Sequence, residues 1–297
     1  MYRENVLISH KTNHRRVIVF LLCATAVAAL HRPEVFAHGT SHELIEAATR
    51  EIASRPDDAP LYLRRANLHL EHGDWRACLL DVDEAERRQT QDLGAGFVRA
   101  RAQAAGGFFA EAKASVDKFL AVHPTHAAAL MQRARVFGAL GKKAEAAEEF
   151  VRAMSHVSQP EPDEVFELAA LLCAAGRDAD ALAAVDRASK ATPGVPSLVE
   201  CGVKIEIGLG NFDGALRRIG DAIAAARIKE PLMARRASVL AQAGRFSESL
   251  AAWRELQARL AALPAGERGS HAMSSLSERT RHAIGALTSL QPQTPKP

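Results

Sequence analysis

The chain has 297 residues, of which 47% are hydrophobic but only 5% aromatic, and its formal net charge at pH 7 is +3. Five basic and two acidic residues among the first 37 account for that excess, so the rest of the chain carries no net charge. This balance gives no overall electrostatic attraction to nucleic acid or to an anionic membrane surface. The sequence also lacks alternating strand-like runs of β-branched residues, which favours an all-α protein.

Residues 1–37 have the pattern of a secretory signal peptide. Two arginines precede an uncharged apolar run at 17–30, and a Val-Phe-Ala triplet follows that ends at Ala37. We therefore expect cleavage after Ala37, with Ala28 as the alternative site. The apolar run is too short to span a bilayer comfortably. The pattern predicts export to the periplasm or to the outside of the cell.

Residues 38–58 are predicted to form a lone N-terminal capping helix. Apolar residues recur there at helical spacing, and Pro56 follows them. Thr40 and Glu43 have the spacing of a capping box, which would start the helix at Thr40.

Residues 59–263 contain an internal repeat of 34 or 35 residues. A glycine recurs at this period, and each glycine indicates where one helix stops and the chain reverses. The reversal needs a left-handed backbone conformation, which costs other residues about 1–2 kcal/mol. The glycines are Gly73, Gly107, Gly141, Gly176, Gly210 and Gly244. They define six blocks: 59–92, 93–126, 127–160, 162–195, 196–229 and 230–263.

Two further columns of the repeat hold only small side chains. When the glycine is placed at position 15, position 8 is alanine or valine in every block, so two helices must approach closely there. Position 20 is also small throughout, and large residues at position 24 fill the space beside it. The residues at position 20 are Cys78, Ala112, Ala146, Ala181, Ala215 and Ser249.

These columns resemble the tetratricopeptide repeat family, whose units are 34-residue helix-turn-helix elements. The resemblance implies an all-α, right-handed superhelical solenoid of about six helical hairpins with capping helices at both ends. One departure is consistent, because position 7 is arginine instead of leucine in four blocks. We therefore expect the units to rely on stacking between neighbours. The four arginines are Arg65, Arg99, Arg133 and Arg236.

Residues 264–290 are predicted to form a C-terminal capping helix, because apolar residues recur at helical spacing from Met273 to Leu287. Such a helix would shield the last apolar edge of the array from water. The segment 291–297 contains three prolines and is predicted to be a disordered tail.

The family resemblance also implies a binding surface. In that family the first helix of each pair lines a concave groove, and here an apolar column at position 5 runs beside a polar, partly basic one at position 9. Such a surface suits a peptide with apolar and acidic groups. The alternative is that the apolar residues pack between helices and the arginines are solvated. The peptide-binding candidates are Leu63, Asn67, Phe97, Arg101, Met131, Arg135, Phe166 and Lys204.

Residues for catalysis or metal binding do not form a recognisable pattern. The sequence contains no nucleophile elbow, no His-Glu-x-x-His motif and no phosphate-binding glycine loop, so we expect neither enzymatic activity nor a cofactor. A remote alternative is a metal-binding protein, because cleavage after Ala37 would place His38 at a free N-terminus with His42 nearby. Cys173 and Cys201 lie on first helices of adjacent blocks, where a disulfide is an alternative to two separate thiols.

The sequence therefore predicts a non-catalytic scaffold of the cell envelope that binds a protein or peptide partner through the groove. The alternative is an accessory subunit that positions a secreted or membrane-bound enzyme. We expect no nucleic-acid partner and no membrane span after signal cleavage, and the sequence leaves the oligomeric state open.

Overall fold

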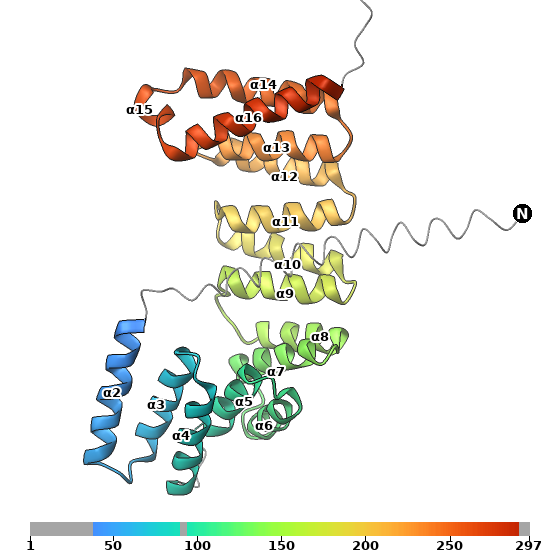
Figure 1. Ribbon diagram of the computed structural model, residues 1–297. Helices are drawn as coiled ribbons and strands as arrows, with labels where there is room; N and C mark the ends of the chain where they lie inside the picture. The colour runs from blue at the N-terminus through green and yellow to red at the C-terminus, as the bar shows by residue number, and fades with distance from the viewer. Residues whose placement is uncertain (1–37, 90–93, 291–297) are drawn as a thin grey trace, which may run out of the picture. The chain divides into compact units, whose positions relative to one another are not determined.

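All regular elements in the described part of the chain are α-helices. The computed structural model describes residues 38–89 and 94–290 (Figure 1). The predicted signal peptide at 1–37 and the predicted tail at 291–297 lie outside these residues. Within them, no helix has the length and apolar character needed to cross a membrane. The prediction of an all-α fold is confirmed.

The helices follow one another as a leading helix, pairs of similar length and a closing helix. The leading helix is α2 (His38–Ser54). The pairs are α3 (Ala59–Glu71) and α4 (Trp75–Arg88), α5 (Ala95–Ala105) and α6 (Phe109–Val122), α7 (Ala127–Ala139) and α8 (Lys143–Met154), α9 (Pro162–Ala174) and α10 (Asp178–Ala191), α11 (Pro196–Gly208) and α12 (Phe212–Ala225), and α13 (Glu230–Gln242) and α14 (Phe246–Ala262). The short α15 (Ala265–Arg268) leads to the closing helix α16 (His271–Leu290).

The chain divides into two compact units, which meet in sequence between Arg177 and Asp178. We call the described residues up to 177 the first unit and residues 178–290 the second unit. The boundary falls between α9 and α10, inside the predicted block 162–195. The repeat pattern gives no sign of this division, because the glycine period continues through it unchanged.

The turn within each helix pair depends on its glycine. All six repeat glycines have a positive φ, between 74° and 86°, as the sequence predicted. At Gly141, for example, the amide of Lys142 donates a hydrogen bond to the carbonyl of Phe137 at 2.9 Å, which closes the end of α7. This left-handed closure satisfies carbonyls that the end of a helix leaves without partners.

The small columns mark the helix crossings in the first unit. Ala134 of α7 and Ala146 of α8 are fully buried, as are the equivalent residues of the two preceding hairpins. The large residue at position 24 of each hairpin is also fully buried, with Phe150 the largest. Small side chains therefore bring the paired helices close together, and one large side chain fills the space that remains.

The arginines at position 7 form a polar seam on one side of this apolar core. In the first unit each arginine joins its own first helix to the second helix of the same hairpin, to that of the preceding hairpin, or to both. We call this set of contacts the arginine seam. Its hydrogen bonds are Arg65 to Asp81 at 2.6 and 2.8 Å, Arg99 to Asp83 and Glu86 at 2.7 and 2.8 Å, and Arg133 to Asp117 and Glu149 at 3.1 and 2.7 Å.

The second unit reaches a similar arrangement with the arginine on the other helix. Arg218 of α12 lies 2.7 Å from a carboxylate oxygen of Asp186 in the preceding α10. Position 7 is Gly202, where a Cβ atom would lie only 2.6 Å from Nε of Arg218. The glycine therefore makes room for a guanidinium group that comes from position 23 instead of position 7.

Helix α2 occupies the place of a preceding second helix. Ala48 and Ile52 are buried at its contact with α3, and Oγ1 of Thr49 accepts a hydrogen bond from Arg65 at 3.0 Å. The predicted capping box at Thr40 is wrong in position, because α2 already begins at His38. Helical backbone that starts two residues earlier puts Thr40 inside the first turn instead of at the N-cap.

Helix α16 packs against α14 and covers the apolar side of the last hairpin. Leu276 and Leu287 join a buried cluster with Trp253 and Leu256. The one polar side chain that α16 buries completely is Thr280, and its hydroxyl donates to the carbonyl of Leu276 at 2.7 Å. The buried hydroxyl therefore keeps a hydrogen-bond partner inside the protein.

Candidate partner-binding face

The first helices of the first three hairpins, α3, α5 and α7, form a continuous layer. Helix α3 packs directly against α5, and α5 packs against α7. The sequence-predicted candidates of the first unit all lie on these helices or on α9. We call the surface formed by Asn67, Phe97, Arg101, Arg135 and Phe166 the first-helix face.

Two of the predicted candidates are core residues. Leu63 is 8% exposed and Met131 is 5% exposed, so their side chains pack between helices. Phe97 and Phe166 are half-buried and keep part of their rings at the surface. The packing alternative therefore holds for Leu63 and Met131, while Phe97 and Phe166 remain accessible to a ligand.

Asn67 and Arg101 contact each other across adjacent hairpins. The guanidinium of Arg101 donates to Oδ1 of Asn67 at 3.0 Å, and Nδ2 of Asn67 donates to the carbonyl of Leu63 at 2.9 Å. The amide that the sequence offered to a peptide backbone is thus already bonded within the protein. Its effect is to hold Arg101 in place.

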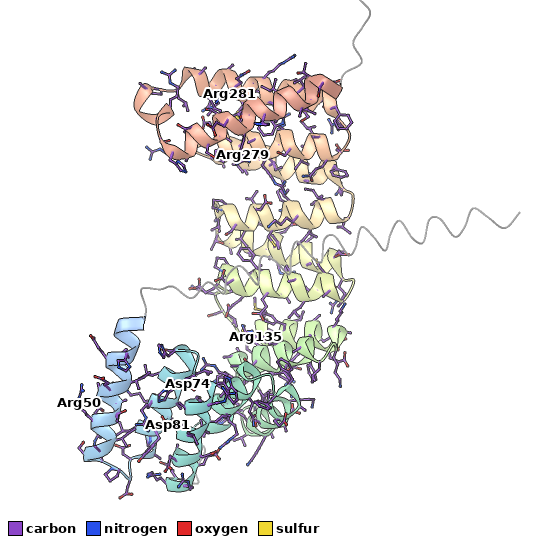
Figure 2. All side chains as sticks on the ribbon, viewed as in Figure 1. Arg50, Asp74, Asp81, Arg135, Arg279 and Arg281 are labelled. Carbon is purple, nitrogen blue, oxygen red and sulfur yellow. The ribbon has the colours of Figure 1, made fainter. Side chains whose placement is uncertain are left out.

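Arg135 already has a carboxylate partner. Its Nε and one terminal nitrogen donate to the two oxygens of Glu167 on α9, both at 2.7 Å, in a two-pronged ion pair. Arg135 is labelled among the side chains in Figure 2. These hydrogen bonds raise the pKa of Arg135 above its ordinary value. Opposite charges at position 9 of one block and position 6 of the next were the sequence signal for this pair.

An aromatic cluster that sequence reasoning missed supports Phe97. Its ring stacks on Phe119 of α6 with centroids 5.6 Å apart, and His126 lies 5.2 Å from both rings. Nδ1 of His126 also accepts a hydrogen bond from the amide of Ala129 at 3.1 Å and so caps α7. His126 is therefore a packing and capping residue, and it fixes the orientation of Phe97.

The last candidate lies in the second unit. Lys204 is exposed on α11. One turn before it, Glu200 accepts two hydrogen bonds from Arg235 of α13, both at 2.9 Å. This ion pair resembles that of Arg135 and Glu167, but here the glutamate comes from the earlier helix and the arginine from the later one.

Comparison with known proteins identifies the fold. No family model matches the chain, and no curated protein matches it. The C-terminal part of a TPR repeat-containing protein from Cytophaga hutchinsonii aligns over 86% of this chain and 94% of its own length, with a TM-score of 0.51 and 13% identity. Yeast Tom70 aligns over 79% of this chain and 49% of its own length, with a TM-score of 0.51 and 12% identity. The chain has the tetratricopeptide-repeat fold.

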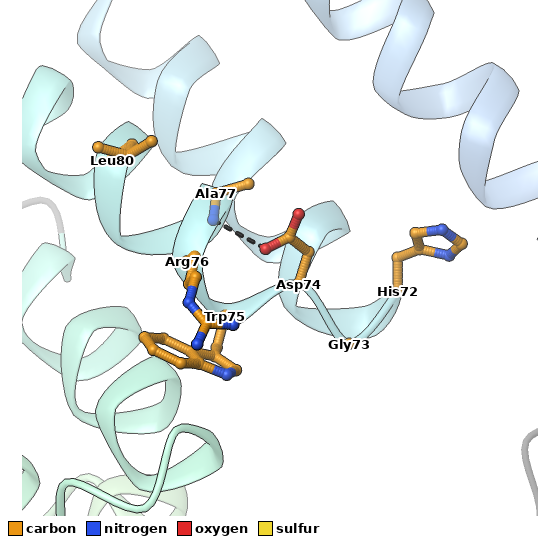
Figure 3. A pocket seen from close by; sticks show the side chains of 7 residues that line it. All are labelled: His72, Gly73, Asp74, Trp75, Arg76, Ala77 and Leu80. Atoms are coloured by element: carbon orange, nitrogen blue, oxygen red, sulfur yellow. Dashed lines mark hydrogen bonds between the residues drawn. The ribbon is translucent and has the colours of Figure 1, made fainter.

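This tetratricopeptide array also has a shallow pocket at its first turn. The pocket measures about 590 Å³ and lies at the turn between α3 and α4 (Figure 3). Two of its polar side chains have contacts within the protein, since Asp74 accepts a hydrogen bond from the amide of Ala77 at 3.0 Å and the guanidinium of Arg76 lies 4.2 Å from the Trp75 ring. None of the residues of the first-helix face lines this pocket.

Metal-ligating residues do not gather in the part of the tetratricopeptide array that the structure describes. No group of three or more histidine, cysteine, aspartate or glutamate side chains there is placed to hold an ion. His42 lies 3.3 Å from Glu46 of its own helix, and the side chain of His38 is outside the described set. Cys173 and Cys201 belong to different units, so a disulfide between them and two separate thiols both stay as alternatives.

Proposed function

We propose that this chain is a non-catalytic interaction protein that holds a protein or peptide partner on the first-helix face. The observation that carries the proposal is a continuous layer of first helices with aromatic and guanidinium groups at its surface. Phe97 and Phe166 offer partly exposed rings, and Arg101 lies beside the first of them. Aromatic and arginine side chains supply most of the binding energy in protein interfaces.

The leader pattern at 1–37 supports a partner in the cell envelope or outside the cell. We therefore propose export of the chain to the periplasm or beyond, followed by partner binding there. A fractionation of cells that express the tagged chain, with mass measurement of its N-terminus, tests the export step. A full-length chain in the cytoplasmic fraction would contradict it.

Site-specific photo-crosslinking in intact cells tests the binding face. A photo-reactive phenylalanine analogue at Phe97 should crosslink to a distinct protein partner. The matched control carries the analogue at Ala114, an exposed position on the second helix α6 of the same hairpin. Equal capture at both positions, or no capture at Phe97, would refute the proposed face.

A further inference from the structure

We propose that Arg101 is an anion-binding subsite that receives an acidic side chain of the partner. This inference rests on the proposed function and names the chemistry of the ligand. Its basis is the side chain of Arg101, which is half-buried but has no carboxylate partner among the described residues. The other partly buried arginines of the first unit each have one.

The partly buried arginines of the first unit differ in their partners. Within the described residues of that unit, four of the five form an ion pair with at least one carboxylate, and the four are Arg65, Arg88, Arg99 and Arg133. Arg101 is the fifth, and its one polar contact there is the neutral amide oxygen of Asn67. Removal of a guanidinium group from water is costly unless an anion compensates it. A ligand carboxylate would supply the missing compensation.

The protein itself shows how such a carboxylate binds on this face. Arg135 occupies position 9 of its block, as Arg101 does, and Glu167 at position 6 of the next block fills its two donor sites. The residue at position 6 of the block after Arg101 is Gln132. Gln132 is uncharged and 8% exposed, so the position that supplies a carboxylate to Arg135 supplies none to Arg101.

The surroundings of Arg101 define what accompanies the acidic group. The guanidinium carbon lies 5.8 Å from the centroid of the Phe97 ring, which is partly exposed and held by Phe119 and His126. A rigid aromatic surface beside a cation favours an acidic residue with an apolar neighbour in the same segment. The ligand class is therefore an acidic peptide with at least one adjacent apolar side chain.

A phage display selection of random 12-residue peptides on the immobilised chain tests this specificity. The enriched sequences should contain glutamate or aspartate next to an apolar residue. One enriched peptide is then made with an amidated C-terminus, in a glutamate form and a glutamine form, and its affinity is measured by fluorescence anisotropy. We expect the glutamine form to bind roughly 10- to 100-fold more weakly.

Three substitutions assign the effect to Arg101. Arg101→Gln should remove the preference for the glutamate form. Gln132→Glu keeps Arg101 but gives it an internal carboxylate, so it should weaken the glutamate form by a similar factor. Glu167→Gln is the matched control, which frees Arg135 and should leave the preference at Arg101 intact. Circular dichroism melting curves of all three must match the original chain for the comparison to count.

The outcomes separate this inference from the proposed function. Enriched peptides with no acidic preference, whose binding is lost in Phe97→Ser, would overturn the anion subsite and retain the binding face. An acidic preference that survives both Arg101→Gln and Gln132→Glu would place the anion elsewhere and also overturn the inference. No enrichment of any peptide would count against both.

Discussion

Two glycines three residues apart are predicted to respond to alanine in opposite directions. Gly138 lies within α7, where a Cβ atom would meet Cδ2 of Leu171 at 3.7 Å, an ordinary contact. Gly138→Ala should therefore stabilise the first unit by about 0.5–1 kcal/mol, because alanine has the higher helix propensity. Gly141 has φ +76° and no atom within 4 Å of the added Cβ, so Gly141→Ala should cost about 1–2 kcal/mol from backbone strain alone. The two variants should thus differ by roughly 1.5–3 kcal/mol.

Urea unfolding followed by tryptophan fluorescence measures this difference in the relevant unit. Trp75 lies in the first unit and Trp253 in the second, so a Trp253→Phe background makes Trp75 the reporter. Gly141→Asn is the control, and it should cost less than alanine because asparagine tolerates the left-handed region better. Destabilisation of equal size in Gly138→Ala and Gly141→Ala would show that strain at the turn is not the cause.

Three other predictions follow from buried groups in the first unit. Ala146→Leu should overpack a fully buried helix crossing and lower the free energy of unfolding by about 1–3 kcal/mol, and an unchanged urea midpoint would contradict the crossing. Burial lowers the pKa of His69 below its ordinary 6.5, so below pH 6.5 the unfolded chain binds a proton at this histidine more readily than the folded chain does. The free energy of unfolding should therefore decrease as the pH is lowered through this range. His69→Gln should reduce this loss, as measured by urea midpoints at about pH 7.5 and about pH 5.5. Burial raises the pKa of the Cys78 thiol to about 11, so iodoacetamide at about pH 8 should modify Cys78 in urea but not in the native chain, and peptide mass analysis reads both.

The sequence was sufficient for those parts of the fold that repeat. The turn at Gly141 and the crossing at Ala146 each follow from one column of the pattern, because only one residue class satisfies the local geometry. The arginine seam did not follow, since Arg133 has a partner 16 residues away in each direction. To find such partners, one must know which face of each second helix meets the next hairpin.

The candidate face was predictable only in part. Leu63 and Phe97 share position 5, yet Leu63 is core and Phe97 is partly exposed, so the position in the repeat does not by itself decide which side chains reach the surface. The family template gives positions but not the burial of each side chain. The pairing of Arg135 with Glu167 was visible in principle as opposite charges in successive blocks. The neutral residue at the same position of the preceding block, Gln132, becomes informative only by comparison with that pair.

The arginine seam makes the order of the hairpins part of the structure. Arg99 takes both of its carboxylate partners from the hairpin before it, Asp83 at position 25 and Glu86. In the last hairpin the corresponding arginine, Arg236, follows Gly220 at position 25, and its side chain is exposed to solvent. A hairpin transplanted behind the wrong neighbour would bury a charge without its partner, so the units of this array are not interchangeable modules. Gain or loss of a hairpin during evolution would therefore be tolerated at some junctions and penalised at others.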